Sequence, residues 1–479
     1  MLLHCQIKFG KKKLRQYTKN PRAHNTRYKD WTRLILKSLN LLARGRKILS
    51  LQKIYMRKFA TLFTSCIILL LSCAKENSTQ PTISESEIIP LEEALGTMTE
   101  LIGSLGILTK SIPPIYSVEV FGGLASKAQE IFLPDTSLYI VNFSDDRGYA
   151  VLAAQRRIST KVFCITESGV LSASDIYDAI EAMDNTFIQS KSTASNEESW
   201  TDFGQKTIPC LIASSMINQI SNDCTADMEF LETKTTTYTG LPDTTAMLET
   251  KWGQMTPFND FRTDHAPAGC VAIATAQIIE FNALHHGYTT FVEDNNVSFD
   301  WPLLKTVYNK SNPYYAGSIS AQNEASSFSQ YIGLSKNCNI SYDIDGSGGY
   351  ADGAKRTFKN MGYSSVKKYF GFENADKNRA IAQLTSGFPM YMDGSRSGGG
   401  HAWVLDGVFV RKVYEDGEYD RTENMFHINW GWNGDGDGYF IQGIFDTTQR
   451  ITYESGVDSG NPAVSRNYTW NYRTITYSL

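Results

Sequence analysis

Cys270 is the residue best suited to nucleophilic chemistry in this sequence. It follows the breaker-rich Pro267-Ala268-Gly269 and begins a run, residues 271–281, that contains no Gly or Pro. The apolar residues at 271, 274, 278 and 281 fit one face of a helix. A thiol in the first turn of a helix faces unpaired backbone N–H groups and the positive end of the helix dipole, so we expect its thiolate to be stabilised. The alternative for Cys270 is a buried structural cysteine.

A general base must come from a histidine in the second half of the chain. The candidates are His265, His285, His286, His401 and His427. His401 follows three glycines and leads into Ala402-Trp403-Val404-Leu405, which is typical of a strand. Glycine lets the backbone pass close to a substrate and a strand holds the ring on a rigid element, as a positioned base requires. His427, on a later predicted strand, is the alternative base.

Two further segments carry groups that a Cys–His pair would use. In Asn429-Trp430, the asparagine amide can accept the second imidazole N–H and the indole can shield that bond from water. After Trp252-Gly253, the side-chain amide of Gln254 can join the Cys270 backbone N–H in an oxyanion hole. The alternative for Gln254 is an ordinary surface glutamine.

Four separated blocks together resemble the streptopain family of papain-like cysteine peptidases. The resemblance covers the chain from about Lys251 to its carboxyl end, in the same order and spacing. The blocks are Trp252-Gly253-Gln254 with Pro257 and Asn259; residues 269–278; Gly400-His401-Ala402 with Asp406-Gly407; and residues 429–432 with Asp437-Gly438.

The resemblance implies a role for each matched residue. Cys270 would be the nucleophile, His401 its base, Gln254 the oxyanion donor, and Asn429 with Trp430 the groups that orient the imidazole. Such a reaction requires no metal and no organic cofactor. The residues that the resemblance assigns to the substrate cleft are Gly399, Gly400, Ser347 and Trp432.

Composition and charge limit the other possibilities. The 479 residues are 42% hydrophobic, which suggests two or three folded domains. Residues 1–58 hold 17 of the 46 basic and one of the 50 acidic residues, so the rest carries 29 basic and 49 acidic residues. A body of that charge is a poor polyanion binder, which excludes nucleic acid as the default partner.

The amino end has the pattern of a processing signal. We expect residues 1–55 to be a non-native upstream extension, because Met56-Arg57-Lys58 opens a basic segment followed by an uncharged apolar run. Leu70-Leu71-Ser72-Cys73 then resembles the lipobox of bacterial lipoproteins, in which the cysteine is lipidated. Residues 56–73 are therefore predicted to be a lipoprotein signal peptide, so that a lipid anchor at Cys73 is the only membrane attachment. The predicted location is the bacterial cell envelope or the exterior.

Residues 74–245 are predicted to form a smaller unit ahead of the peptidase. A helix is expected at about 91–105, a β-hairpin at 138–143 and 149–152, and a third strand at 162–165. These segments and Glu167-Ser168-Gly169 are similar to the family's inhibitory propeptide. The threonine-rich stretch Glu232 to Thr245 is expected to be an exposed connector and the natural place for activating cleavage. The charged stretch from Val410 to Asn424 is expected to be a hairpin that alters the rim of the site.

The resulting hypothesis is an α+β protein. A papain-like two-lobed cysteine peptidase domain, residues 246–479, would follow a smaller α+β propeptide domain. The function predicted is a secreted or lipid-anchored endopeptidase that acts on protein or peptide substrates and is held latent by its own propeptide. The alternatives are a thiol amidase or acyl transferase on the same fold, and a non-catalytic surface adhesin.

Overall fold

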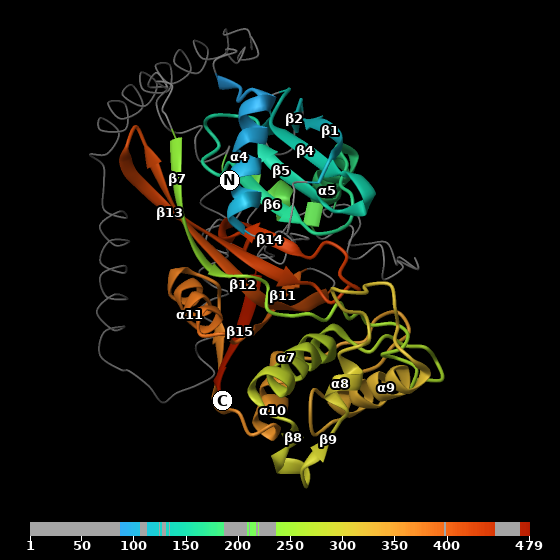
Figure 1. Cartoon of the computed structure of the whole chain (residues 1–479). Coiled ribbons are helices and arrows are strands. Elements are labelled where there is room, and N and C mark those ends of the chain that lie inside the picture. Colours follow the sequence, from blue (N-terminus) through green and yellow to red (C-terminus); the bar gives the residue numbers. More distant parts are fainter. Residues whose placement is uncertain are drawn as a thin grey trace, which may run out of the picture. The chain divides into compact units, whose positions relative to one another are not determined.

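The computed structural model describes eleven segments of the chain (Figure 1). They are residues 87–105, 113–123, 125–126, 131–133, 135–185, 208–209, 211–216, 219, 236–396, 399–445 and 470–479. The predicted extension 1–55, the predicted signal 56–73 and its Cys73 lie outside the described residues. Within the described segments, no helix is long and apolar enough to cross a membrane.

The amino-terminal region contains the elements that the sequence predicts. Helix α4 spans Leu91–Leu105, and its buried residues recur on one face. The predicted hairpin is β4 (Leu138–Phe143) and β5 (Tyr149–Ala153), paired antiparallel, and the third strand is β6 (Val162–Thr166). The remaining elements are β1 (Ile115–Phe121), β2 (Ala125–Ser126), β3 (Ile131–Phe132), the 3₁₀ turn η2 (Ser144–Asp146) and α5 (Ala173–Asn185).

A helical layer carries the predicted nucleophile. Its central helix is α7 (Cys270–His286), in which every residue from 270 to 283 is buried. A helix that is apolar all round must be covered by other elements on every side. Those around it are α8 (Trp301–Leu304), α9 (Ile319–Gly333) and α10 (Ala351–Asn360), with β8 (Thr290–Phe291), η4 (Val292–Asp294) and β9 (Val297–Ser298) at the periphery.

The second layer is a sheet. Among the described residues, strands from both regions join in one eleven-stranded sheet, in which β6 pairs with β14. Its order is β1-β4-β5-β6-β14-β13-β12-β11-β15-β10, with β7 paired to β12. The later elements are β10 (Ser364–Phe370), α11 (Asn374–Thr385), β11 (Met390–Arg396), β12 (Gly399–Glu415), β13 (Glu418–Asn429), β14 (Gly438–Ile441), η5 (Gln442–Phe445) and β15 (Trp470–Ser478).

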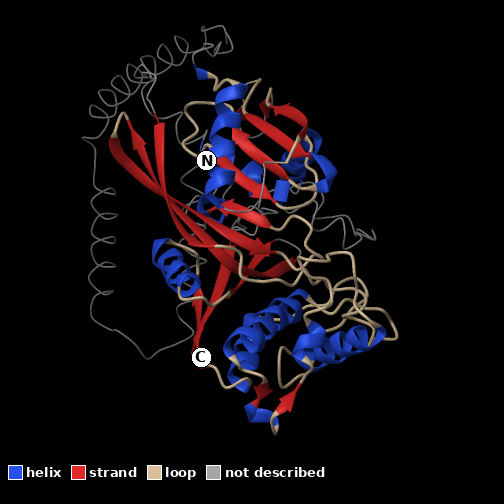
Figure 2. Ribbon diagram, in the orientation of Figure 1, coloured by secondary structure: helices blue, strands red, loops and turns tan. Residues whose placement is uncertain are grey.

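Alternation along β11 and β12 produces two cores, one on each face of the sheet. Tyr391 and Val404 belong to the core shared with α7, α9 and α10. Their neighbours Met392 and Trp403 belong to the other core, with α11 and the amino-terminal strands. Successive strand residues point to opposite faces, so one β-strand supports both layers. Figure 2 shows the helices of the first layer gathered apart from the strands. The predicted α+β class is confirmed.

The predicted connector is not a loop over most of its length. Thr236–Thr244 form strand β7, which pairs antiparallel with β12. The expectation of an exposed connector at 232–245 was wrong there, because the threonines that make the segment polar are β-branched and favour a strand where a partner is available. Residues from Ile83 onward group as one compact unit, so the boundary predicted at 245 stays a prediction.

The charged stretch 410–424 forms the long arms of the β12–β13 hairpin. The hairpin turns at Asp416-Gly417, both with positive φ. At about 3.3 Å per strand residue, the turn lies some 50 Å along the strand from His401. The predicted hairpin is confirmed, and its effect on the rim of the site stays a prediction.

Candidate active site

Cys270 is the first residue of α7, as predicted. Gly269 before it has a φ of 93°. A Cβ on Gly269 would lie 3.1 Å from Cγ2 of Ile340 and 3.6 Å from Cβ of Ser347. Glycine is required there because it tolerates the positive φ and leaves space for the 340–347 segment to pack over the start of the helix. The segment around Ser347 therefore lies next to the predicted nucleophile.

The thiol of Cys270 is neutral in this form of the protein. Burial raises its pKa to about 11, and the carboxylate of Asp393 adds to this while the backbone N–H of Ala402 opposes it. The sequence predicted a stabilised thiolate. That prediction was wrong for the structure described, because Cys270 is only 9% exposed and desolvation outweighs the donors of the helix N-terminus.

His401 lies on β12, next to Ala402. The backbone N–H of Ala402, the residue that follows His401, is close enough to the sulfur to favour its thiolate. The imidazole is buried, and its Nε2 donates to the backbone carbonyl of Trp430 at 2.7 Å. A carbonyl only accepts, so the Nε2 proton is fixed and the lone pair of a neutral ring is on Nδ1. The structure thus places the predicted nucleophile close to the residue that follows the predicted base, and the contact between sulfur and imidazole stays a prediction.

Three indoles surround the imidazole. The ring of Trp432 is nearest, stacked at 4.9 Å between centroids, and those of Trp403 and Trp430 follow at 6.1 and 6.4 Å. Trp430 and Trp432 stack on each other at 5.1 Å. The shielding predicted for the Trp430 side chain is therefore shared, with Trp432 as the closest ring.

Asn429 does not bond to the imidazole. Its Oδ1 accepts from Nε2 of Gln277 at 2.9 Å and from the N–H of Gly431 at 3.1 Å, and its Nδ2 donates to the carbonyl of Thr250 at 2.9 Å. The predicted bond between this amide and the His401 ring was wrong, since the next residue's backbone carbonyl occupies that position. Asn429 instead fixes the end of β13, from which the Trp430 carbonyl projects.

Gln277, on α7, is a site residue that the sequence analysis missed. It is fully buried, and its Oε1 accepts from the hydroxyl of Thr250 at 2.8 Å and from the N–H of Trp252 at 3.4 Å. Together with its bond to Asn429, this amide joins the nucleophile's helix, the segment before Gln254 and the strand end that holds His401. An internal helical glutamine carries no signal of such contacts in a single sequence.

Gln254 lies in the segment directly beside Cys270. Its backbone carbonyl accepts from the N–H of Ala268 at 2.8 Å. The side chain is 5% exposed, and its Oε1 is buried without a hydrogen-bond partner among the described residues. It is therefore not the surface glutamine of the alternative interpretation. A Cβ on Gly253 before it would lie 2.2 Å from Oδ1 of Asn433, so the Asn433 side chain would have to move.

The residues predicted for the substrate cleft lie in three places. Gly399 and Gly400 open β12 and pair with Arg396 and Ser395 of β11. Ser347 is buried, and its hydroxyl bonds to the backbone of Asp343 in its own loop. Trp432 stacks on His401, as described above. Their role toward a substrate stays a prediction.

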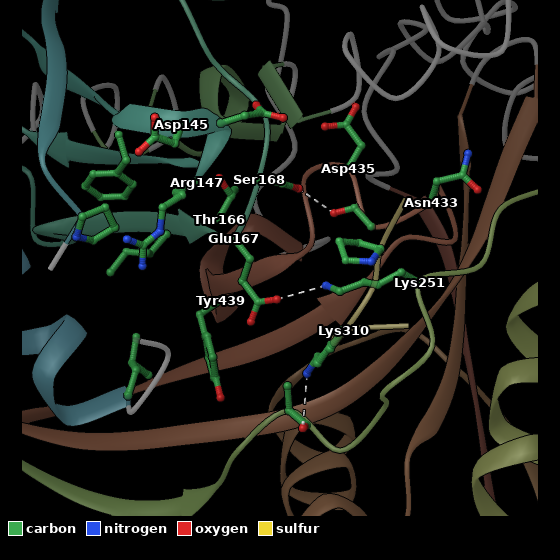
Figure 3. Close-up of a pocket in the computed structure, with 18 of the residues that line it drawn as sticks. Asp145, Arg147, Thr166, Glu167, Ser168, Lys251, Lys310, Asn433, Asp435 and Tyr439 are labelled. Carbon is green, nitrogen blue, oxygen red and sulfur yellow. Dashed lines mark hydrogen bonds and ion pairs between the residues drawn. The ribbon is translucent and has the colours of Figure 1, made fainter. Parts of the chain in front are cut away.

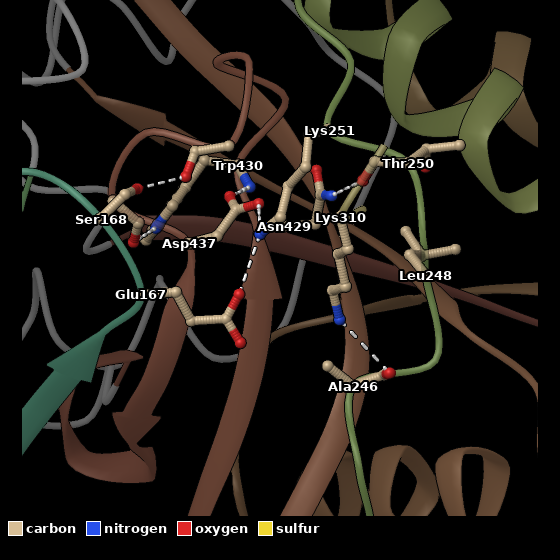
Figure 4. A network of polar contacts seen from close by, with 12 residues as sticks. Glu167, Ser168, Ala246, Leu248, Thr250, Lys251, Lys310, Asn429, Trp430 and Asp437 are labelled. Atoms are coloured by element: carbon tan, nitrogen blue, oxygen red, sulfur yellow. Dashed lines mark hydrogen bonds and ion pairs between the residues drawn. The ribbon is translucent and has the colours of Figure 1, made fainter. Parts of the chain in front are cut away.

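A network of charged side chains joins the amino-terminal region, from α4 to α5, to the site-bearing region, from residue 246 onward (Figure 4). Glu167, which follows β6, contacts Nζ of Lys251 at 3.0 Å and Nε2 of His427 at 3.3 Å. Lys251 also contacts Oδ2 of Asp437 at 3.0 Å, and Nδ1 of His427 contacts Asp406 at 2.5 Å. His427, the alternative base, is thus a member of this network.

The network fixes the charge of its members. Burial opposes the charged ring of His427, but Asp406 and Glu167 raise its pKa to about 9. Burial likewise favours neutral Glu167, yet His427 and Lys251 lower its pKa well below the ordinary value. At neutral pH Glu167 is an anion between two cations. Asp437 connects these charges to the site, because its Oδ1 accepts from the N–H of Trp430 at 2.8 Å.

A cavity of about 810 Å³ lies at this junction (Figure 3). Its walls come from both regions, with Arg147, Glu167 and Ser168 on one side and Lys251 and Lys310 on the other. Neither Cys270 nor His401 lines it. The cavity therefore marks the contact between the two regions and not the site of the thiol.

A thiol at the start of a buried helix, close to a strand that carries a histidine, is the arrangement expected of a cysteine-nucleophile site of the papain-like kind. The helix and the sheet form separate lobes of one unit, and each contributes one member of the pair.

Comparison with known proteins matches the site-bearing part of the chain to one family. Residues 252–440 match the model of the Peptidase C10 family. Streptopain from Streptococcus pyogenes, including its serotype M1 form, is 33% identical over 202 residues, covering 38% of this chain and 46% of the relative. The chain thus spans about half the length of the curated relatives that it matches.

Two solved structures from Prevotella intermedia are similar in part. A fragment of prointerpain A is 16% identical with a TM-score of 0.42, covering 75% of this chain and 98% of that one. Active wild-type interpain A cysteine protease is 21% identical with a TM-score of 0.33, covering 48% of this chain and 92% of that one. Because both scores are below 0.5, neither likeness supports a statement about the present fold.

Proposed function

We propose that this protein is a bacterial cysteine endopeptidase that is made as a zymogen. The observation that carries the proposal is the placement of the Cys270 sulfur near the backbone N–H of Ala402, the residue after His401, whose Nε2 is held by the Trp430 carbonyl. The match of residues 252–440 to the Peptidase C10 family supports the same reaction. The substrates are proteins or peptides.

The mechanism uses the residues of the site in sequence. Nδ1 of His401 takes the thiol proton, and the Cys270 thiolate adds to the peptide carbonyl carbon. The Cys270 backbone N–H and the Gln254 side-chain amide hold the negative oxygen of the tetrahedral intermediate. The C–N bond then breaks as the imidazolium returns its proton to the leaving amine. Water, deprotonated by His401, hydrolyses the thioester and restores the thiol.

The amino-terminal region acts as the intramolecular inhibitor in this proposal. The turn after β6 docks on the 431–438 loop, with the Glu167 N–H donating to the Asp437 carbonyl at 2.7 Å and the Ser168 hydroxyl donating to the Gly434 carbonyl at 2.6 Å. That loop carries Trp432, which covers the imidazole. The buried, neutral thiol fits a latent form, and activation requires that this docking be released.

Export completes the proposal. Residues 56–73 direct secretion, and Cys73 receives the lipid that anchors the mature protein to the cell envelope. Mass spectrometry of the protein from a bacterial membrane fraction tests this step. A lipid-modified amino-terminal peptide that begins at Cys73 is expected, and an unmodified peptide spanning residues 70–76 would contradict it.

Trace wild-type protein incubated with full-length Cys270→Ala tests activity and latency together. We expect the intact variant to be cut and the processed wild type to digest casein. Labelling by an epoxide-type thiol reagent should follow processing and be absent from Cys270→Ala. Labelling without cleavage of casein or of the variant would favour a thiol amidase or acyl transferase. No labelling after removal of the amino-terminal region would favour a non-catalytic binder.

A further inference from the structure

Strand β7 is paired along nearly its whole length with the site-bearing region. Its register partners run from Thr236 opposite Glu415 to Thr244 opposite Val408. The partner strand β12 uses its first half, up to Leu405, to pair with β11 on the same edge. Strand β7 therefore pairs with the same edge of β12, beyond the point where β11 ends (Figure 1). The backbone of β12 in the long hairpin is thus paired on both sides, with β7 and with β13.

The chain beyond β7 remains bonded to the same region as far as the site. The N–H groups of Met247 and Leu248 donate to the carbonyl and the carboxylate of Asp406, at 2.8 and 2.9 Å. The carbonyl of Glu249 accepts from the Lys310 N–H at 2.7 Å, and the Lys251 N–H donates to Tyr308 at 2.7 Å. Thr245 is exposed, but it stands between two bonded stretches.

A protease must draw several consecutive residues into an extended, unpaired conformation in its own cleft. Exposed loops meet this requirement at little cost, whereas a paired strand must first separate from its partner. Residues 236–251 form no such loop, since backbone bonds recur throughout the segment. The stretch that its composition marks as a cleavable connector is thus protected by its pairing.

We infer that β7 is a permanent strand of the peptidase and that the activating cut falls on the amino-terminal side of Thr236. The mature enzyme keeps residues 236–251 as a continuous segment that connects the β12–β13 hairpin to Gln254. That the cut activates an enzyme rests on the proposed function. The protection of β7 from proteolysis does not depend on that function.

Limited digestion of full-length Cys270→Ala with subtilisin tests the protection without any activity of the protein itself. Intact-mass measurement and amino-terminal sequencing of the stable carboxyl-terminal fragment should give a start at or before Thr236. A stable fragment that starts between 237 and 251 would overturn the inference. Self-processed wild type should have the same boundary. If the self-processed fragment starts between 237 and 251, the inference is refuted and the proposed function stands. If subtilisin gives the expected fragment but the wild type does not process itself, the inference stands and the proposed function is refuted.

Two proline variants in the same background test the cause of the protection. In an antiparallel pair, N–H groups of alternate residues point to the partner, so either Tyr238→Pro or Thr239→Pro removes a bond to β12. At least one should be cut within 236–251 at least ten times faster than the parent. The matched variants Tyr238→Val and Thr239→Val keep the N–H and should be cut at the parent rate. Equal cleavage rates for all four variants would show that strand pairing does not protect residues 236–251.

Discussion

The buried amide of Gln277 is predicted to position the general base without touching a substrate. The perturbation is Gln277→Met, which keeps the length and approximate volume of the side chain and removes its three hydrogen bonds. The strongest of these are to the Thr250 hydroxyl at 2.8 Å and to Oδ1 of Asn429 at 2.9 Å. Asn429 then holds the strand end from which the Trp430 carbonyl reaches His401.

The expected magnitude follows from the groups left behind. Each buried polar group that loses its partner costs about 1–3 kcal/mol, so with two strong bonds lost the free energy of unfolding should fall by about 2–6 kcal/mol. If the carbonyl shifts and the imidazole loses its orientation, kcat should fall by about 10- to 100-fold. KM should stay near the wild-type value, since Gln277 is fully buried and cannot contact a substrate.

The assay is steady-state hydrolysis of a peptide by the processed enzyme, with thermal denaturation in parallel. Gln277→Glu keeps an acceptor for Thr250 and replaces the donor to Asn429, so it should lose kcat although one bond is retained. The control is Thr275→Val on the same helix, whose buried hydroxyl donates to the Val271 carbonyl at 2.6 Å and has no link to Asn429. It should lose stability and keep kcat. A Gln277→Met enzyme with wild-type kcat would refute the positioning role.

Three other changes have defined outcomes. In full-length Cys270→Ala, Glu167→Gln should lower the melting temperature most below about pH 6.5, the ordinary His pKa, and progressively less as the pH rises through about 9. The reason is that the pKa of His427 is raised to about 9, so the stability gained from its charged ring is lost as the ring deprotonates. A difference in melting temperature that does not vary with pH would contradict this. Gly269→Ala should cost about 1–3 kcal/mol of stability and slow iodoacetamide alkylation of Cys270, because its φ is 93° and Ile340 is 3.1 Å from the added Cβ; wild-type behaviour in both measurements would be inconsistent with the strain. Asp393→Asn should move the pH midpoint of Cys270 alkylation lower, since that carboxylate helps to raise the thiol pKa; an unchanged or higher midpoint would count against the electrostatic assignment.

Local patterns in the sequence predicted the local elements well. The helix at 91–105, the hairpin at 138–152 and the helix opened by Cys270 all occur where turn residues and apolar spacing place them. Each depends on contacts between near neighbours, so composition and periodicity suffice. The encounter of Cys270 with the start of β12 followed only from the joint pattern of several blocks.

Long-range hydrogen bonds could not be predicted in the same way. The imidazole is held by a backbone carbonyl, which every residue possesses and which has no signature in a sequence. An asparagine nearby was the natural choice, but its amide is used by Gln277 and Thr250. The pairing of Thr236–Thr244 with β12 was missed because a polar, threonine-rich segment is equally compatible with a loop until a partner strand is known.

The shared sheet has a consequence for the processed molecule. Strand β14 is hydrogen-bonded to β6 on one side and to β13 on the other. When the amino-terminal region departs, the backbone groups of Gly438, Tyr439 and Phe440 that faced β6 lose their partners and meet water. Maturation as proposed would therefore create a new sheet edge at the end of the 431–438 loop. Because β14 has only four residues, this edge is too short to pair extensively with strands of other molecules.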